Sequence, residues 1–380
     1  MLTGHGGNYH YWASVLGCPP DEIIDMSSNV NPLGPMDGLV ERLRNRMETI
    51  GALPEADASG VIRRFGRRYG IDPARVLVGN GTTQFIYALP GILDCRNVLI
   101  FGPTYSDYAD AFRLGGAALV HRLATPEADF CHALDDLDAE ERDCDTVVIC
   151  NPNNPTGNLI PRDALENFCR RNDRRTIVVD ESYLPFSDAE ETGTLLGSDL
   201  PNVIVLHSLS KIFRIPGLRI GFAISANPQL IRRFRQAQQP WCVNALAQEA
   251  ACFLLDPQCP TDAFIAETRR FFEAEKRAMV EILSKEAGLR VFPSATSFLL
   301  VRLPAGLSAS SVVEETVRTH RILLRDCSNF HGLDSRFLRV SLKTSEANRL
   351  VAQWLCRLAR GIGKRGGWER FDFTGVSSAP

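Results

Sequence analysis

Short apolar runs recur along the first two thirds of the chain, and amphipathic, helix-like segments separate them. Each run is continuously apolar rather than alternating, which is typical of a strand that is covered on both faces. The pattern therefore predicts an α/β fold, with a mostly parallel central sheet and helices on both faces. The predicted strands are residues 76–78, 98–101, 146–150, 176–180, 203–207 and 220–224.

A second, smaller unit follows this core. Residues 262–287 place apolar side chains on one face among charged ones, which predicts a long helix that can bridge two domains. Strand candidates and one helix then alternate, which predicts a small α+β domain. They are the strands 297–302, 322–325 and 337–341 and the helix 310–319.

These patterns predict the domain organisation. We expect residues 46–260 to form the large domain and residues 261–360 the small one, with the N-terminal segment 1–45 packing on the small domain. The tail 361–380 is rich in Gly and Ser, and we expect it to be disordered.

Charge and cysteine content exclude several functional classes. The chain has 380 residues with 42 Lys and Arg against 45 Asp and Glu, so no net field would gather nucleic acid or anionic lipid. The 11 cysteines are scattered singly, without the spacing of a metal site, and we interpret them as reduced thiols. No apolar run approaches the ~20 residues that span a membrane, and no signal-peptide pattern begins the sequence. We expect a cytoplasmic protein without a metal site, a nucleic-acid partner or a membrane partner.

Candidate chemistry lies after the predicted strands, because ligands of such sheets bind outside the carboxyl ends of the strands. Lys211 follows the strand 203–207 in the segment Ser208-Leu-Ser210-Lys211. Burial there would lower the pKa of Lys211 and favour the neutral amine, which condenses with an aldehyde. Alone, a lysine after a strand is more often a solvated loop residue. Four accompanying motifs, its companions, therefore decide whether Lys211 binds an aldehyde.

Two companions suit an aromatic cofactor ring. Asp180 ends the apolar strand 176–180 and needs a cationic partner, such as a pyridinium nitrogen, unless it only caps a helix. Asn154 lies in the turn Asn-Pro-Asn-Asn-Pro-Thr-Gly and can donate a hydrogen bond to a ring oxygen, although such a segment can also be only a turn.

Two further companions suit the rest of that cofactor. Gly81, Thr82 and Thr83 follow the strand 76–78 and open a helix, where free N–H groups favour a phosphate. Tyr105 follows the strand 98–101 and can stack on an aromatic ring. A phosphate cup, a stacking ring, an oxygen donor, a pyridinium acid and an aldehyde-binding lysine together predict pyridoxal 5′-phosphate (PLP).

With these residues in this order, nearly the whole chain resembles the fold-type I, aspartate-aminotransferase-like family of PLP enzymes. The resemblance implies that Lys211 forms the Schiff base, Asp180 pairs with the pyridinium, and Asn154 and Tyr183 bond the ring oxygen. It also implies a homodimer whose active sites borrow groups across the interface. The implied catalytic residues are Lys211, Asp180 and Tyr183. The implied cofactor-binding residues are Gly81, Thr82, Thr83, Tyr105, Asn154, Asp180, Tyr183, Ser208, Ser210, Lys211 and Arg219.

Within this family, the two ends of the chain resemble the threonine-phosphate decarboxylases of the cobalamin pathway, through His5-Gly-Gly-Asn and Leu324-Arg-Asp-Cys-Ser-Asn-Phe. Arginines suit the two anionic ends of a phosphorylated amino acid. The implied substrate-binding residues are His5, Gly6, Asn29, Asn154, Arg325 and Arg339.

The implied reaction is decarboxylation of O-phospho-L-threonine to (R)-1-aminopropan-2-yl phosphate, for the nucleotide loop of a cobamide. A histidinol-phosphate or related aminotransferase is the first alternative, since it uses the same cofactor. A non-catalytic binding protein that retains the fold is the second, and Lys211 and Asp180 argue against it.

Two positions depart from the family pattern. Leu53 stands where a tyrosine commonly reaches the cofactor phosphate of the partner subunit, and Leu53 cannot donate a hydrogen bond. Gln84 stands where a glutamate is usual. Both changes leave the chemistry intact and predict a weaker hold on the cofactor.

Overall fold

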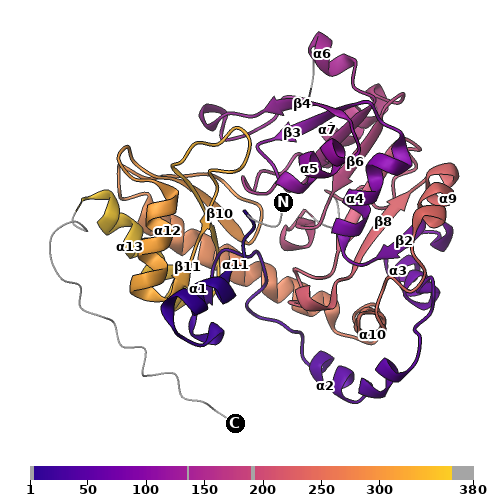
Figure 1. Cartoon of the computed structure of the whole chain (residues 1–380), viewed down its shortest axis with the longest axis horizontal. Helices are drawn as coiled ribbons and strands as arrows, with labels where there is room; N and C mark the ends of the chain where they lie inside the picture. Colours follow the sequence, from indigo (N-terminus) through magenta and orange to yellow (C-terminus); the bar gives the residue numbers. More distant parts are fainter. Residues whose placement is uncertain (1–3, 135–136, 190–192, 362–380) are drawn as a thin grey trace.

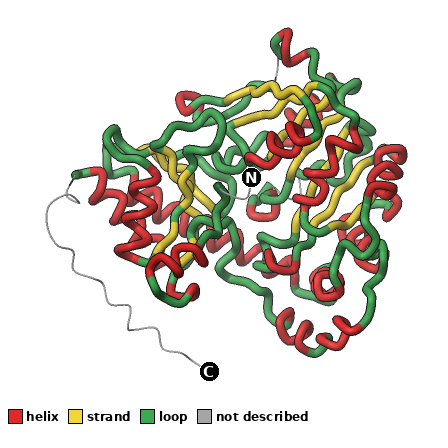
Figure 2. The backbone as a smooth tube through the Cα atoms, viewed as in Figure 1, coloured by secondary structure: helices red, strands yellow, loops and turns green. Residues whose placement is uncertain are grey.

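The computed structural model describes residues 4–134, 137–189 and 193–361 (Figure 1). Its strands form two groups, a large sheet and a smaller one, with helices around each (Figure 2). The tail 361–380, for which the sequence predicts disorder, lies outside the described residues except for Gly361.

The large sheet has seven strands in the order β2-β8-β7-β6-β5-β3-β4. The strands β7, β6, β5, β3 and β4 run parallel, and β8 is antiparallel to both of its neighbours. The mostly parallel α/β sheet predicted from the apolar runs is therefore confirmed. Its strands are β2 (Val76–Gly79), β3 (Asn97–Gly102), β4 (Ala118–Leu123), β5 (Thr146–Cys150), β6 (Thr176–Asp180), β7 (Val203–Ser208) and β8 (Gly221–Ser225).

Helices cover both faces of this sheet, which explains why its strands are continuously apolar. Val147 and Ile149 of β5 belong to one core cluster, whereas Val148 and Cys150 belong to another. The helices α4 (Thr82–Leu93), α5 (Ser106–Leu114) and α9 (Pro228–Ala237) cover one face. The helices α3 (Ser59–Tyr69) and α7 (Arg162–Arg171) and part of α11 (Thr261–Leu283) cover the other.

The smaller unit holds a four-stranded antiparallel sheet in the order β12-β13-β10-β9. The predicted strand 322–325 is in fact two short strands in different sheets, since Leu324 separates β11 from β12. The long helix α11 packs on α13 and lies between the two groups of strands (Figure 1). The bounds are β9 (Arg290–Val291), β10 (Phe298–Arg302), α12 (Ala309–His320), β11 (Ile322–Leu323), β12 (Arg325–Asp326), β13 (Phe337–Ser341) and α13 (Ser345–Ala359).

The N-terminal segment contacts both units. Its strand β1 (Ile24–Asp25) pairs in parallel with β11. Figure 1 shows α1 (Tyr9–Leu16) near β11, in the region of the smaller unit. Its later helix α2 (Leu39–Arg44) packs instead on α10 (Ala245–Leu254). Arg42 and Arg46 both form ion pairs with Glu249 there. The loop after β1 therefore crosses from the small unit to the large one.

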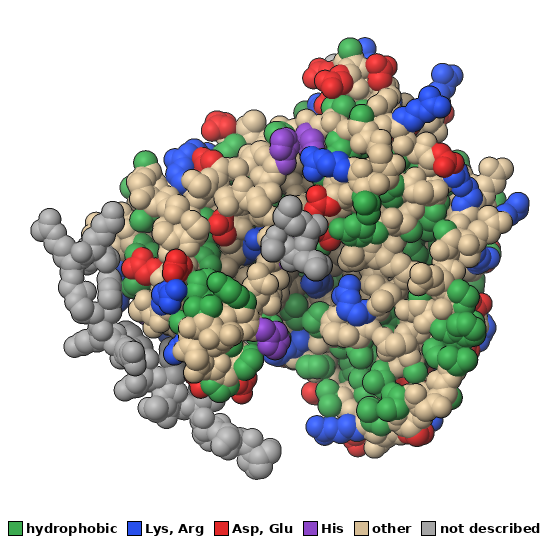
Figure 3. Space-filling model, viewed as in Figure 1, with side chains coloured by type: hydrophobic (Ala, Val, Ile, Leu, Met, Phe, Trp, Pro, Cys, Tyr) green, Lys and Arg blue, Asp and Glu red, His purple; other side chains and the backbone are tan. Residues whose placement is uncertain are grey.

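Exposed apolar side chains gather on the segment that follows α2. Met47, Ile50 and Leu53 have 45, 65 and 76% of their surface exposed. Hydrophobic side chains are visible at the lower edge of Figure 3, where Figure 1 places α2. Among the helices of the described residues, none is long and apolar enough to cross a membrane.

Candidate active site

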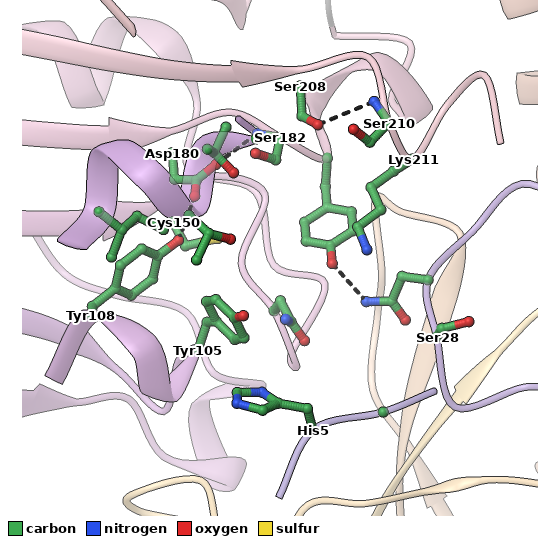
Figure 4. Close-up of a pocket in the computed structure, with 18 of the residues that line it drawn as sticks. His5, Ser28, Tyr105, Tyr108, Cys150, Asp180, Ser182, Ser208, Ser210 and Lys211 are labelled. Carbon is green, nitrogen blue, oxygen red and sulfur yellow. Dashed lines mark hydrogen bonds between the residues drawn. The ribbon is translucent and has the colours of Figure 1, made fainter. Parts of the chain in front are cut away.

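The carboxyl ends of β5, β6 and β7 open into a cavity of about 250 Å³. Every site residue predicted from the sequence lines it, so the structure brings the two ends of the chain to the centre of the large sheet. The predicted residues in this lining are His5, Gly6, Asn29, Gly81, Thr82, Thr83, Tyr105, Asn154, Asp180, Tyr183, Ser208, Ser210, Lys211, Arg219, Arg325 and Arg339. In Figure 4, Lys211 and Asp180 approach the cavity from opposite sides, with Tyr105 and His5 below them.

Lys211 follows β7, and its amine points into the cavity. Burial lowers the pKa of Lys211 to about 8, and the positive charges of Arg339 and Arg219 act in the same direction. The backbone fixes this position, because Asn31 N donates a 3.1 Å hydrogen bond to the Lys211 carbonyl. A substantial fraction of the neutral, nucleophilic amine is therefore present near physiological pH.

Asp180 is the last residue of β6, and only 4% of its surface is exposed. Its Oδ2 accepts a 2.7 Å hydrogen bond from Tyr108 Oη, and its Oδ1 accepts a 2.9 Å bond from Ser182 N. Burial raises the pKa of Asp180, and these two hydrogen bonds oppose that rise. Both donors are neutral, so the buried carboxylate lacks a cation, which a pyridinium nitrogen would supply.

The start of α4 forms an anion cup. Gly81 has φ +75° and precedes the helix without any side-chain cap, so the first N–H groups of α4 remain available. A Cβ on Gly81 would lie 2.6 Å from Arg219 Nη2, so only glycine lets the guanidinium approach this closely. Gln84 braces the turn, since its Oε1 accepts a 2.6 Å hydrogen bond from Asn80 N. The cup fits a phosphate.

Tyr183 and Asn154 can each donate a hydrogen bond to an oxygen on a ligand ring in the cavity. Tyr183 Oη accepts a 3.0 Å hydrogen bond from Asn29 Nδ2, and Asn29 Oδ1 in turn accepts from Ser341 Oγ at 2.5 Å. Burial raises the pKa of Tyr183 to about 12, so its phenol stays protonated as a donor. Asn154 Oδ1 accepts from Arg339, which leaves the Asn154 amide nitrogen as the second donor.

Arg325 and Arg339 are buried arginines, with 9 and 5% of their surfaces exposed. Arg339 donates to Asn154 Oδ1 and, at 2.5 Å, to the Ser27 carbonyl, and its Nε has no hydrogen-bond partner. Arg325 donates to the Gly4 carbonyl and, at 2.7 Å, to Asn329 Oδ1. Neither forms an ion pair with a carboxylate of the described residues. Both are available for a bound anion.

The N-terminal strap, residues 4–7, crosses the cavity beside these arginines. Gly7 N donates a 2.7 Å hydrogen bond to Ser27 Oγ, and the Gly4 carbonyl accepts from Arg325 and Asn329. A Cβ on Gly6 would lie 2.4 Å from the Ser27 carbonyl oxygen, so a glycine is required for this approach. The strap places the imidazole of His5 at the cavity.

Sequence reasoning missed several lining residues. Tyr108 bonds Asp180, but it lies on α5 rather than at the end of a strand. Its place in the first turn of the helix that begins directly after Tyr105 is the signal that could have placed it near Tyr105. Ser27 bonds Arg339 through its backbone carbonyl, which no residue type reveals. The missed lining residues are Ser27, Ser28, Ile86, Tyr108, Cys150, Ser182 and Phe330.

One further missed residue lies behind the lining. Lys343 Nζ donates to the carbonyls of Ser28 and Val30, at 3.1 and 2.7 Å, and these two residues flank Asn29. Burial lowers the pKa of Lys343 to about 8. Lys343 thereby holds the loop that presents Asn29 to Tyr183.

Comparison with known proteins identifies the family. The sequence profile of class I and II aminotransferases matches residues 21–354. The chain belongs to this family. A threonine-phosphate decarboxylase of Salmonella typhimurium is 32% identical over 364 residues, which are 95% of this chain and 98% of that protein. A histidinol-phosphate aminotransferase of Methanothermobacter thermautotrophicus is 28% identical over 92% of both chains.

A solved structure agrees with this family assignment. The L-threonine-O-3-phosphate decarboxylase of Porphyromonas gingivalis superposes with a TM-score of 0.80 and 28% identity, over 90% of this chain and all of that one. The fold-type I prediction is therefore confirmed. The cofactor is PLP, as predicted, and the protein is a PLP-dependent enzyme.

The residues of this aminotransferase-family site fit PLP. The cup at Gly81 and Arg219 would hold the phosphate, and Asp180 would face the ring nitrogen. Tyr183 and Asn154 would bond the ring oxygen, and Lys211 would bond the aldehyde carbon. These assignments follow from the chemistry of each donor and acceptor.

Proposed function

We propose that this enzyme removes the carboxylate of O-phospho-L-threonine, which releases CO2 and leaves (R)-1-aminopropan-2-yl phosphate. The observation that carries the proposal is the pair of buried arginines without a carboxylate partner, Arg325 and Arg339. Because Arg219 beside Gly81 would serve the cofactor phosphate, these two arginines suit a substrate with two anionic groups of its own.

The second candidate function is a histidinol-phosphate aminotransferase, which a relative with 28% identity favours. Histidinol phosphate carries a phosphate but no carboxylate. It would therefore leave one of the two arginines unpaired in its own complex, whereas the 2-oxoglutarate that accepts the amino group would present two carboxylates to the same pair. Phosphothreonine has one anion for each arginine. The 32% identity to a threonine-phosphate decarboxylase supports the same choice.

Which bond at the substrate Cα breaks depends on how Arg325 and Arg339 orient the substrate. When bound, PLP supplies an electron sink that accepts the electron pair of a bond held perpendicular to its ring. Arg339 lies against Asn154 beside the ring-oxygen donors, whereas Arg325 lies against the N-terminal strap. Anchoring the substrate at these two points would fix the rotation about its Cα, and that rotation would decide which bond breaks.

The chain's own residues complete the reaction. Asp180, held by Tyr108 and Ser182, would stabilise a positive charge on the ring nitrogen of bound PLP. Lys211, whose pKa is about 8, can hold a proton near Cα and return it after CO2 has left. The intact pair of Lys211 and Asp180 also argues against a non-catalytic binding protein.

Product analysis tests the proposal directly. Purified enzyme with PLP and carboxyl-labelled phosphothreonine should release labelled CO2 without any keto acid. Phosphoserine and free threonine serve as comparison substrates, since they lack the methyl and the phosphate respectively. Background CO2 together with glutamate formation from histidinol phosphate and 2-oxoglutarate would replace this function with the aminotransferase.

A further inference from the structure

Asp107 is a buried carboxylate that the cofactor chemistry does not use. It lies in the first turn of α5, and 5% of its surface is exposed. Its Oδ2 accepts a 2.6 Å hydrogen bond from Tyr105 Oη. Its Oδ1 has no hydrogen-bond partner and lies 3.5 Å from His5 Nε2. One oxygen of this carboxylate is therefore directed at the N-terminal strap.

We propose that Asp107 is a positioning residue that fixes the imidazole of His5 over the cavity, so that the other ring nitrogen of His5 faces the phosphate of the substrate. This inference rests on the proposed function, which supplies the phosphate. A histidine that donates one N–H to a carboxylate has a set tautomer and ring orientation. A bond from Nε2 to Asp107 leaves Nδ1 for the ligand.

A simple helix-capping role does not account for Asp107. Acidic residues in a first turn stabilise a helix through its free N–H groups, but α5 has no side-chain cap, and the contacts of Asp107 are with Tyr105 and His5. Burial of an unpartnered carboxylate oxygen is unfavourable, and an N–H of His5, whose Nε2 lies 3.5 Å away, would relieve that cost.

The charged groups around His5 agree with this arrangement. Asp107 and the phenol of Tyr105 face it from α5, and Arg325 lies next to it, because Arg325 donates to the Gly4 carbonyl. Asp110 and Arg113 line a separate cavity behind the strap and pair with each other at 3.8 Å. His5 thus lies 3.5 Å from Asp107 on one side, while Arg325 holds the backbone of the strap.

The experiment compares Asp107→Asn with the matched control Asp110→Asn, an acid one turn further along the same helix. Asp107→Asn should raise KM for phosphothreonine about tenfold or more, by analogy with the groups that orient metal-binding histidines. The kcat value and the absorbance of bound PLP should stay near those of the wild type. Asp110→Asn should change neither KM nor kcat.

A double-mutant cycle shows whether Asp107 acts through His5. If it does, the variant with both Asp107→Asn and His5→Asn should bind no more weakly than His5→Asn alone. Fully additive losses would overturn the proposal. A fall in kcat or a shifted PLP spectrum with unchanged KM would also overturn it, because Asp107 would then act through Tyr105.

Inorganic phosphate separates this inference from the proposed function. Calorimetric titration of the holoenzyme with phosphate requires no turnover. Asp107→Asn and His5→Asn should weaken phosphate binding by a similar factor, and Asp110→Asn should leave it unchanged. Unaltered phosphate binding in Asp107→Asn would refute the positioning role. Weakened binding by an enzyme that releases no CO2 would preserve the role and refute the decarboxylase.

Discussion

Arg325 and Arg339 occupy directly opposed positions in the antiparallel pairing of β12 and β13. Opposed residues project to the same face of a sheet, where like charges repel. Two buried guanidinium groups on one face are therefore unfavourable without a ligand. In the ligand-free protein this repulsion persists at the cavity. A bound substrate with two anionic groups would remove it.

We expect Arg325→Met to lower kcat/KM for phosphothreonine at least tenfold, since a buried anion without its partner costs about 2–5 kcal/mol. The same change should leave the Tm of the ligand-free protein equal or higher, because it removes the repulsion with Arg339. Thermal unfolding and steady-state kinetics measure the two effects. A lower Tm with near-normal kcat/KM would mean that Arg325 serves the fold rather than the substrate.

The pKa of Lys211 predicts how the apoenzyme binds PLP covalently. Below a pKa of about 8 the amine is mostly protonated, so the rate of attachment should rise about tenfold per pH unit and level off above about pH 8. With a solvent-exposed lysine, the rate would keep rising toward pH 10.5, the usual pKa of that side chain. Lys211→Ala should abolish turnover. Borohydride reduction and peptide mapping must place the label on Lys211.

Tyr108→Phe should weaken the hold on PLP without blocking its covalent attachment. The change removes a 2.7 Å hydrogen bond to the Asp180 carboxylate, and a bond to a charged group contributes about 1.5–3 kcal/mol. The dissociation constant of PLP, followed by absorbance during dialysis, should rise about tenfold. Tyr11→Phe, at a residue 63% exposed on α1, is the control and should match the wild type.

Lys343 gives the stability of the protein a pH dependence of known sign. Its pKa is lowered to about 8 in the folded protein from the usual lysine value of 10.5, so the unfolded chain binds more protons between these values. Stability from this group therefore increases as pH rises through that window. The difference in unfolding free energy between wild type and Lys343→Met should grow from pH 8 to pH 9.5 in urea titrations. Lys285→Met, at an exposed lysine, is the control variant.

The exposed apolar segment around Leu53 predicts the assembly. We expect a homodimer in sedimentation, in which Met47, Ile50 and Leu53 are covered by the partner subunit. If Leu53 lies near the cofactor phosphate of that partner, Leu53→Tyr should slow the loss of PLP during dialysis. A monomer would refute the interface, and unchanged retention would show that the segment does not reach the phosphate.

The sequence was most informative where chemistry follows a buried strand. The strands β5 and β6 begin and end at the predicted residues, and Asp180 and Lys211 follow from the rule that ligands bind at strand ends. The strand β4 escaped notice because it is an edge strand with His121 and Arg122 among its apolar residues. The antiparallel direction of β8 could not be predicted, since a buried strand has the same pattern in either direction.

Contacts between segments far apart in the chain could not be predicted from the sequence. The approach of His5 to Asp107 depends on the path of the N-terminal strap. Secondary-structure propensity does not determine that path. Similarly, the single predicted strand 322–325 became β11 and β12, so the pairing of Arg325 with Arg339 emerged only from the register of the small sheet.

The site is divided between two sets of elements. Residues assigned to the cofactor, from Gly81 to Arg219, belong to the large sheet and its loops, whereas His5, Asn29, Arg325 and Arg339 come from the N-terminal segment and the small sheet. If the second set binds the substrate, as we propose, cofactor chemistry and substrate choice can be inherited separately. We expect that a chimaera which exchanges only the second set between relatives would change the preferred substrate and retain PLP. Such modular descent would explain how lyases and aminotransferases share one scaffold.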